Sequence, residues 1–251
     1  MNQTARYLLF IAMAGTMFAA AQTPDGAAQS GKSVTDNPVA QVREAKSIEY
    51  GPFAYYGNGI GDRSNYRFFA FGGQAGKPLT RVLHAGILSG QFEYGFNIMP
   101  FWQAYTPAPH QQASYCEVNG QIVACELSFG GGTFTGLSLT PVILRWNFLT
   151  RSRRFQPWFQ GAGGLIYTTH KFPPEFLTTQ TINGETVNID SGTSVWNFSP
   201  QGGIGFHYFT RARRSIDVGI NAVHISSASL GDRNPGVNAS VQFQVGYTFW
   251  K

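Results

Sequence analysis

The stretch HISSASLGDRNPGVN places a histidine and a serine two positions apart, as His224 and Ser226. In serine esterases, a histidine takes the proton of a serine hydroxyl, and the serine oxygen then attacks the carbonyl carbon of an ester. Residues two apart on a β-strand share a face, with about 6.6 Å between their backbones, so the two side chains can lean together. The spacing alone suits an esterase site and a polar pair at a membrane interface equally well.

The strand that carries this pair decides which face the two side chains occupy. Its sequence, RSIDVGINAVHIS, alternates with a period of two. One face is apolar and consists of Ile216, Val218, Ile220 and Ala222. Counting on by twos reaches His224 and Ser226, whereas Asp217, Gly219 and Asn221 occupy the other face. Polar groups on a lipid-facing row are costly unless they serve a function or the membrane interface lies at that point, so both interpretations stay open here.

The same alternation recurs from about residue 46 to the C-terminus. One face carries large apolar residues, and the other carries mainly Gly, Asn, Gln and Ser rather than the Lys and Glu of a water-facing sheet. Small polar side chains fill the interior of a narrow barrel, while the apolar face suits lipid. The sequence therefore predicts an all-β fold, an eight-stranded antiparallel transmembrane β-barrel of the outer-membrane type. Its strands are expected at about 47–58, 64–75, 81–102, 133–149, 155–169, 194–210, 214–226 and 237–250.

The lengths of the connections predict the orientation of the barrel. Short turns belong on the periplasmic side and long loops outside. The expected short turns are 76–80, 150–154 and 210–214, and the expected long loops are 103–132, 170–193 and 227–236. Two of the turns, TRSRR and TRARR, are basic, and the net charge is +5. Basic turns at a membrane surface explain these charges, so we expect no nucleic-acid partner. The five tryptophans are expected in the interfacial belts.

The N-terminus has the layout of a secretory signal, with a lone Arg6, an apolar run over residues 7–18 and three alanines that end at Ala21. The sequence predicts a signal peptide over 1–21 and a flexible periplasmic lead over 22–45, followed by the outer-membrane barrel over 46–251. No later stretch approaches the roughly 18 apolar residues that a membrane helix needs.

The two cysteines of the chain, Cys116 and Cys125, flank the loop-like stretch EVNGQIVA. In an exported protein, such a pair predicts a local disulfide. Two cysteines without a neighbouring pair of histidines make a poor metal site, so we expect no metal there.

The C-terminal stretch resembles the active-site segment of the outer-membrane lipid A 3-O-deacylases, the PagL-like family. The shared pattern is His-x-Ser, a small residue before a loop, an Asn and a Gly, and a third catalytic residue twelve positions after the serine. The matching positions are His224, Ser226, Ala228, Asn234, Gly236 and Asn238. The motif covers only this segment, and the eight-strand layout extends the likeness over most of the mature chain. The chain departs from the family at Asn238, where the family has glutamate, and at Ser227, where asparagine is common.

The resemblance implies an esterase that removes an ester-linked acyl chain, the 3-O-linked hydroxyacyl chain of lipid A. Ser226 would be the nucleophile, His224 the base and Asn238 the residue that orients His224. An asparagine orients a histidine through its carbonyl but supplies no charge to stabilise the imidazolium. Strict alternation points Asn238 inward, away from His224, so either a bulge re-aims it or another residue is the third partner.

The resemblance also implies groups that bind the substrate. The oxyanion would be held by Asn234 and by backbone N–H groups near Ala228 and Ser229. From its place in the loop beside this site, Arg233 would either contact the phosphates of lipid A or form a solvated turn pair with Asp232. No metal or other cofactor is required by this mechanism, although a cation that bridges the substrate phosphates stays open. The expected partners are lipid A and lipopolysaccharide in the outer leaflet, and a homodimer is left open.

Two other functions compete with the esterase. One is a non-catalytic outer-membrane barrel with an adhesive or structural role, whose long loops bind a partner. The other is a narrow channel, which a packed polar interior disfavours. The chain contains no GxSxG motif, which argues against an ordinary soluble lipase.

Overall fold

The structure is a computed structural model that describes residues 37–108, 110–118, 120–129, 131–173, 177–182, 185–190, 194–228 and 238–251. The signal peptide expected over 1–21 and the first part of the expected lead lie outside these residues. Within the described ranges, no helix is long and apolar enough to cross a membrane.

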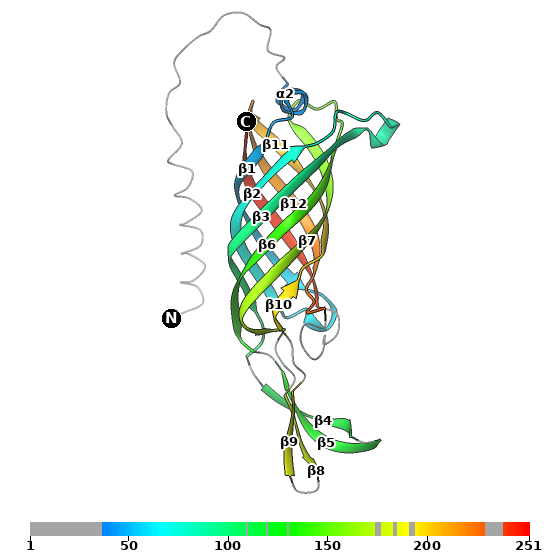
Figure 1. Cartoon of the computed structure of the whole chain (residues 1–251), viewed down its shortest axis with the longest axis vertical. Helices are drawn as coiled ribbons and strands as arrows, with labels where there is room; N and C mark the ends of the chain where they lie inside the picture. Colours follow the sequence, from blue (N-terminus) through cyan, green and yellow to red (C-terminus); the bar gives the residue numbers. More distant parts are fainter. Residues whose placement is uncertain are drawn as a thin grey trace, which may run out of the picture. The chain divides into compact units, whose positions relative to one another are not determined.

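The main sheet is an antiparallel barrel (Figure 1). Its strands are β1 (Glu49–Gly59), β2 (Arg67–Pro78), β3 (Gly90–Tyr105), β6 (Thr133–Phe148), β7 (Phe155–Phe172), β10 (Ser194–Phe198), β11 (Gln201–Arg211), β12 (Arg214–His224) and β13 (Ala239–Trp250). Neighbours pair in the order β10, β7, β11, β12, β13, β1, β2, β3 and β6, and a further pairing of β6 with β7 closes the sheet.

Strands β10 and β11 act as one strand of the barrel. Phe198 pairs with Leu165 of β7, and Gln201 pairs with Ala162 of the same strand, so the register continues unchanged across the gap. The interruption falls at Pro200, which has no N–H to donate to a ladder. With these two segments counted together, the barrel has eight strands, which confirms the predicted fold.

The faces of the strands are arranged as the alternation predicts. Large apolar side chains such as Tyr56, Ile204 and Phe243 are about half exposed on the outer wall. Polar side chains such as Gln74, Asn97 and Gln244 are buried inside. The barrel is therefore inside-out relative to a soluble protein, and its outer surface suits lipid.

The connections differ from the expected ones in two places. β3 begins at Gly90 rather than at residue 81, because 79–89 form a longer connection that includes the 3-10 turn η2 (Gly86–Leu88). Gly86 has a φ of 58°, a conformation that ends extended chain. Two of the three expected long loops, 103–132 and 170–193, each contain a hairpin. The strands are β4 (His110–Val118), β5 (Gln121–Phe129), β8 (Leu177–Ile182) and β9 (Glu185–Asp190). These four strands form a second sheet in the order β4, β5, β8, β9.

Part of the expected flexible lead is helical. Residues Pro38–Ala45 form helix α2, which begins where the Asn37 side chain accepts a hydrogen bond of 3.1 Å from the Ala40 N–H. Pro38 at the first helical position has no N–H that would need a partner. The apolar side of α2 packs against one end of the barrel. This end carries the short turns and the last residues of β13. The buried cluster there consists of Val39, Val42, Phe209 and Trp250.

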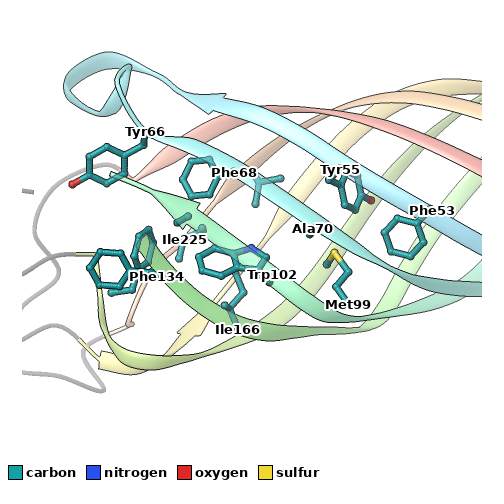
Figure 2. Close-up of a cluster of buried hydrophobic side chains, with 13 residues drawn as sticks. Phe53, Tyr55, Tyr66, Phe68, Ala70, Met99, Trp102, Phe134, Ile166 and Ile225 are labelled. Carbon is teal, nitrogen blue, oxygen red and sulfur yellow. The ribbon is translucent and has the colours of Figure 1, made fainter. Parts of the chain in front are cut away.

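The barrel interior has two zones. The end reached by the long connections β3–β6, β7–β10 and β12–β13, called here the long-loop end, is filled by apolar side chains (Figure 2). This apolar plug consists of Phe53, Tyr55, Tyr66, Phe68, Ala70, Met99, Trp102, Ala104, Phe134, Ile166, Phe172, Val223 and Ile225. The opposite end, called the short-turn end, has charged inward-facing residues, which are Glu49, Glu93, Arg145, His207 and Asp217.

The tryptophans do not all lie in an interfacial belt. Trp102, Trp158 and Trp250 are inside the barrel and at most 4% exposed, because they fall on inward-facing strand positions. Trp250 donates a hydrogen bond of 3.0 Å from its indole N–H to the Ser215 hydroxyl, so the polar atom of this buried ring is satisfied. Trp196 is half exposed on the outer wall, as expected.

Candidate active site

His224 and Ser226 lie on the outer wall at the long-loop end. His224 is the last residue of β12, and Ser226 continues the same strand direction two residues later. Both side chains are partly exposed, whereas the intervening Ile225 is 1% exposed in the apolar plug. The structure therefore places the two predicted catalytic residues on the same face of the strand. This face is the outer, lipid-facing surface of the barrel.

The neighbouring strand holds the backbone of the pair in position. Ser226 and Phe198 exchange two backbone hydrogen bonds, of 2.7 and 3.0 Å. The His224 N–H donates to the Pro200 carbonyl at 3.0 Å. Proline has no N–H to return, so the ladder between these strands makes one bond fewer beside His224. Phe198 and Pro200 are thus the cross-strand neighbours of the serine and the histidine.

An apolar wall continues from the pair along the outside of the barrel. Phe198 is 39% exposed, and Trp196 is half exposed two residues before it on the same face. The Trp196 ring lies 4.9 Å from the Tyr167 ring, measured between centroids. Aromatic side chains next to a serine and a histidine form a surface along which an acyl chain can pack without entering water.

The hydroxyl of Ser226 already faces a backbone donor. The Ala228 N–H donates to the Ser226 Oγ at 3.1 Å. Ala228 has a φ of 46°, in the left-handed region that non-glycine residues adopt only at a cost. This backbone turn places the Ala228 N–H group beside the Ser226 hydroxyl oxygen.

The third residue predicted for the site lies on the other face. Asn238 is 1% exposed inside the barrel, and its carbonyl accepts a hydrogen bond of 2.8 Å from the Ile225 N–H. Among the residues that the structure describes, no hydrogen-bond partner lies near its side-chain oxygen or nitrogen, and the same is true of the hydroxyl of buried Ser227. Strict alternation continues through Asn238, without the bulge that would turn it outward. The structure does not bring Asn238 to His224.

Several predicted residues fall outside the described residues. Ser229, Arg233 and Asn234 belong to 229–237, which the structure does not describe. The side chains of Cys116 and Cys125 are also outside the description. The backbone register pairs Cys116 with Val123 and Cys125 with Ser114, so the two cysteines are offset by two positions across the hairpin. The disulfide stays a prediction.

One charged group of the long-loop end is paired within the fold. The Arg63 guanidinium donates to the Tyr66 hydroxyl at 2.6 Å. Burial raises the pKa of the Tyr66 phenol above its usual value, and the positive charge of Arg63 opposes this shift. Tyr66 therefore stays protonated at neutral pH.

Phe198 and Pro200 were not predicted as neighbours of the serine and the histidine. The sequence does contain one indication of Pro200, because a proline inside an otherwise alternating strand marks an interrupted hydrogen-bond ladder.

A second group of ionisable residues, Glu49, His207 and Asp217, is gathered inside the barrel at the short-turn end. Each was predictable as inward-facing, but their proximity depends on strand register.

The fold defines an outer-membrane β-barrel, and a serine and a histidine lie two residues apart on its outer wall. The model of the family described as lipid A 3-O-deacylase (PagL) matches residues 89–248, which is more than half of the chain. The chain belongs to this family. Membership supports lipid A deacylation, a hydrolase activity, in the outer membrane.

Solved structures with related folds include the outer membrane enzyme PagL. It is 12% identical, with a TM-score of 0.43, over 80% of this chain and 98% of that chain. Neisserial surface protein A is 11% identical, with a TM-score of 0.42, over 80% and 96% of the two chains. The attachment invasion locus protein Ail of Yersinia pestis is 10% identical, with a TM-score of 0.35, over 81% and 95%. Among curated proteins, none matches the chain.

Proposed function

We propose that the protein hydrolyses the ester that joins the 3-O-linked hydroxyacyl chain to lipid A, with Ser226 as nucleophile and His224 as base. The observation that carries this proposal is the placement of both residues on the outer wall at the long-loop end. Lipid A lies in the outer leaflet, so a site on the outer wall meets the substrate without extracting it from the membrane. The family assignment supports the same substrate.

The proposed reaction proceeds in two steps. His224 takes the Ser226 proton as the serine oxygen attacks the ester carbonyl carbon. The Ala228 N–H donates to Ser226 Oγ in the free protein, and it would donate to the adjacent oxyanion as this forms. The bond to the sugar oxygen then breaks, and His224 returns the proton to that oxygen. A water molecule, activated by His224, hydrolyses the acyl-serine and regenerates the hydroxyl. The Phe198 and Trp196 rings would hold the acyl chain beside the serine.

The proposal is tested with the refolded barrel and lipopolysaccharide in detergent, followed by mass spectrometry of the lipid A. The expected product has lost one hydroxyacyl chain, with release of the corresponding free hydroxy fatty acid. Lipid A variants that lack the 3-O-linked chain but keep the other ester-linked chains distinguish the position of the cleaved ester. An unchanged mass with the folded barrel would favour the non-catalytic barrel instead.

We expect Asn238→Ala to leave the deacylation rate within about threefold of the parent. The Asn238 amide is buried inside the barrel, on the face opposite to His224. Loss of a residue that orients a catalytic histidine costs about ten-thousand-fold in rate, so the two outcomes are far apart. The measurement is the initial rate of fatty acid release.

The matched control for this variant is Asn197→Ala, which removes another inward-facing amide at the long-loop end. It corrects for any general effect of a lost buried amide on folding. A rate at least a hundredfold lower in folded Asn238→Ala, but not in Asn197→Ala, would show that Asn238 acts on His224 during the reaction.

A further inference from the structure

A group of buried ionisable residues fills the barrel at the short-turn end, away from His224 and Ser226. Arg145 lies between two carboxylates, with its Nη1 2.6 Å from Glu49 Oε1 and 2.9 Å from Glu93 Oε1. His207 lies beside them, and its Nδ1 is 2.7 Å from Asp217 Oδ1. All five side chains are at most 3% exposed.

Two atoms of this group face each other, and neither has a hydrogen-bond partner within the described part of the chain. They are Glu49 Oε2 and His207 Nε2. The distance between them is 3.9 Å, which is too long for a hydrogen bond even if the imidazole is protonated. A buried carboxylate oxygen and a buried imidazole nitrogen are both costly to leave unpaired, so a further group is needed between them.

The imidazole is held in the orientation of a metal ligand. Asp217 accepts from His207 Nδ1, and Asp217 is itself held by Ser215 at 2.8 Å and Gln74 at 3.2 Å. A carboxylate on one ring nitrogen fixes the tautomer that leaves the lone pair on the other nitrogen, as in carboxylate–histidine–metal arrangements. His207 Nε2 is therefore available as a ligand on the side of Glu49.

The charge balance of the group favours a cation over water. Three carboxylates, of Glu49, Glu93 and Asp217, surround the single guanidinium of Arg145 among the described interior residues at this end. Carboxylates therefore outnumber guanidinium groups here, and an ionised carboxylate in a buried position needs a positive partner. A water molecule would satisfy the hydrogen bonds but would add no charge, whereas a divalent cation would also supply positive charge to Glu49.

The distances and the local space fit such an ion. Zinc binds histidine nitrogen and carboxylate oxygen at about 2.0–2.2 Å, so one ion reaches both atoms across the 3.9 Å gap. One ligand atom each from Glu49, His207 and Asp217 lies within 4.8 Å of the others. Gly76 makes room for the carboxylates, because a Cβ there would lie 2.8 Å from Glu93 Oε1 and 2.9 Å from Glu49 Oε1.

We propose that the interior of the barrel binds one divalent transition-metal ion, of the Zn²⁺ type, between Glu49 Oε2 and His207 Nε2. Asp217 orients the histidine, Arg145 shields the other oxygen of Glu49, and water completes the coordination. The site lies just inside helix α2, whose Val42 packs with Trp250, and the Trp250 ring is 5.2 Å from the His207 ring. The ion would tie β1 to β11 across the barrel and stabilise the folded state.

The experiment uses the full mature chain, refolded with Zn²⁺ present, freed of any histidine tag and dialysed against metal-free buffer. Inductively coupled plasma mass spectrometry is expected to find about one equivalent of zinc per chain. We expect Glu49→Gln and His207→Gln to lose it, whereas His84→Gln, which removes an exposed histidine, retains it. A strong chelator is expected to lower the melting temperature of the parent but not that of Glu49→Gln.

Replacement of buried residues can prevent folding, so the parent alone provides a second measurement. Refolding with Co²⁺ is expected to give visible absorption bands of a nitrogen and oxygen site, and X-ray absorption should show only nitrogen and oxygen ligands. Folded parent that keeps no metal after dialysis would overturn the proposal. Zinc retained by both folded Glu49→Gln and folded His207→Gln would overturn the location.

Discussion

Replacement of Ser226 by alanine is expected to lower the deacylation rate by about ten-thousand-fold or more, because removal of the nucleophile in a serine hydrolase has an effect of about this size or larger. Ser226 lies on the outer wall, and its Oγ accepts a hydrogen bond from the Ala228 N–H. The variant loses the attacking oxygen, whereas the apolar plug behind it stays unchanged. The measurement is the initial rate of fatty acid release from lipopolysaccharide in detergent.

The control for this variant is Ser64→Ala, which removes an exposed serine in the connection between β1 and β2. It is expected to keep the parent rate. The folded state of both variants is checked by the shift in electrophoretic mobility between unheated and boiled samples. If folded Ser226→Ala released hydroxy fatty acid at the parent rate, another residue would have to be the nucleophile.

Replacement of Arg145 by leucine is expected to destabilise the barrel by about 3–5 kcal/mol, the cost of removing one partner from a buried ion pair. The guanidinium contacts Glu49 and Glu93, and its Nε donates to Gln160 Oε1 at 3.2 Å. Without it, two carboxylates face each other in the interior. The measurement is the free energy of unfolding in urea, followed by tryptophan fluorescence of the barrel in lipid vesicles.

The matched control is Arg81→Leu, because Arg81 is exposed in the connection before β3. It is expected to change the stability by less than about 0.5 kcal/mol. The triple variant Glu49→Gln, Glu93→Gln, Arg145→Gln should recover part of the loss, because the two carboxylates that Arg145 contacts are then neutral. Equal destabilisation by Arg145→Leu and Arg81→Leu would mean that the buried ion pairs contribute nothing to stability.

The barrel was predictable because alternation is a local property of each strand. A side chain such as Phe243 or Gln244 reveals its face through its neighbours in the sequence. The start of β3 was missed because the apolar residues before Gly90 resemble strand residues, although Gly86 breaks the pattern. Helix α2 was missed in a polar segment, although Asn37 followed by Pro38 is a recognisable helix start.

The site was predictable in part for the same reason. The outward placement of His224 and Ser226 follows from counting along one strand, and so does the inward placement of Asn238. The contacts to Phe198 and Pro200 depend on the register between strands, which alternation does not specify. The grouping of Glu49 with Arg145 and His207 also needs the closed barrel, because these residues come from strands far apart in the sequence.

The position of His224 and Ser226 on the outer wall also determines which concentration governs the proposed reaction. A substrate embedded in the same leaflet reaches such a site by lateral diffusion within the membrane. The rate should then follow the mole fraction of lipid A among the surrounding lipids or detergent rather than its amount per volume of buffer. Added inert detergent would slow the enzyme by surface dilution, even at a constant total amount of lipid A.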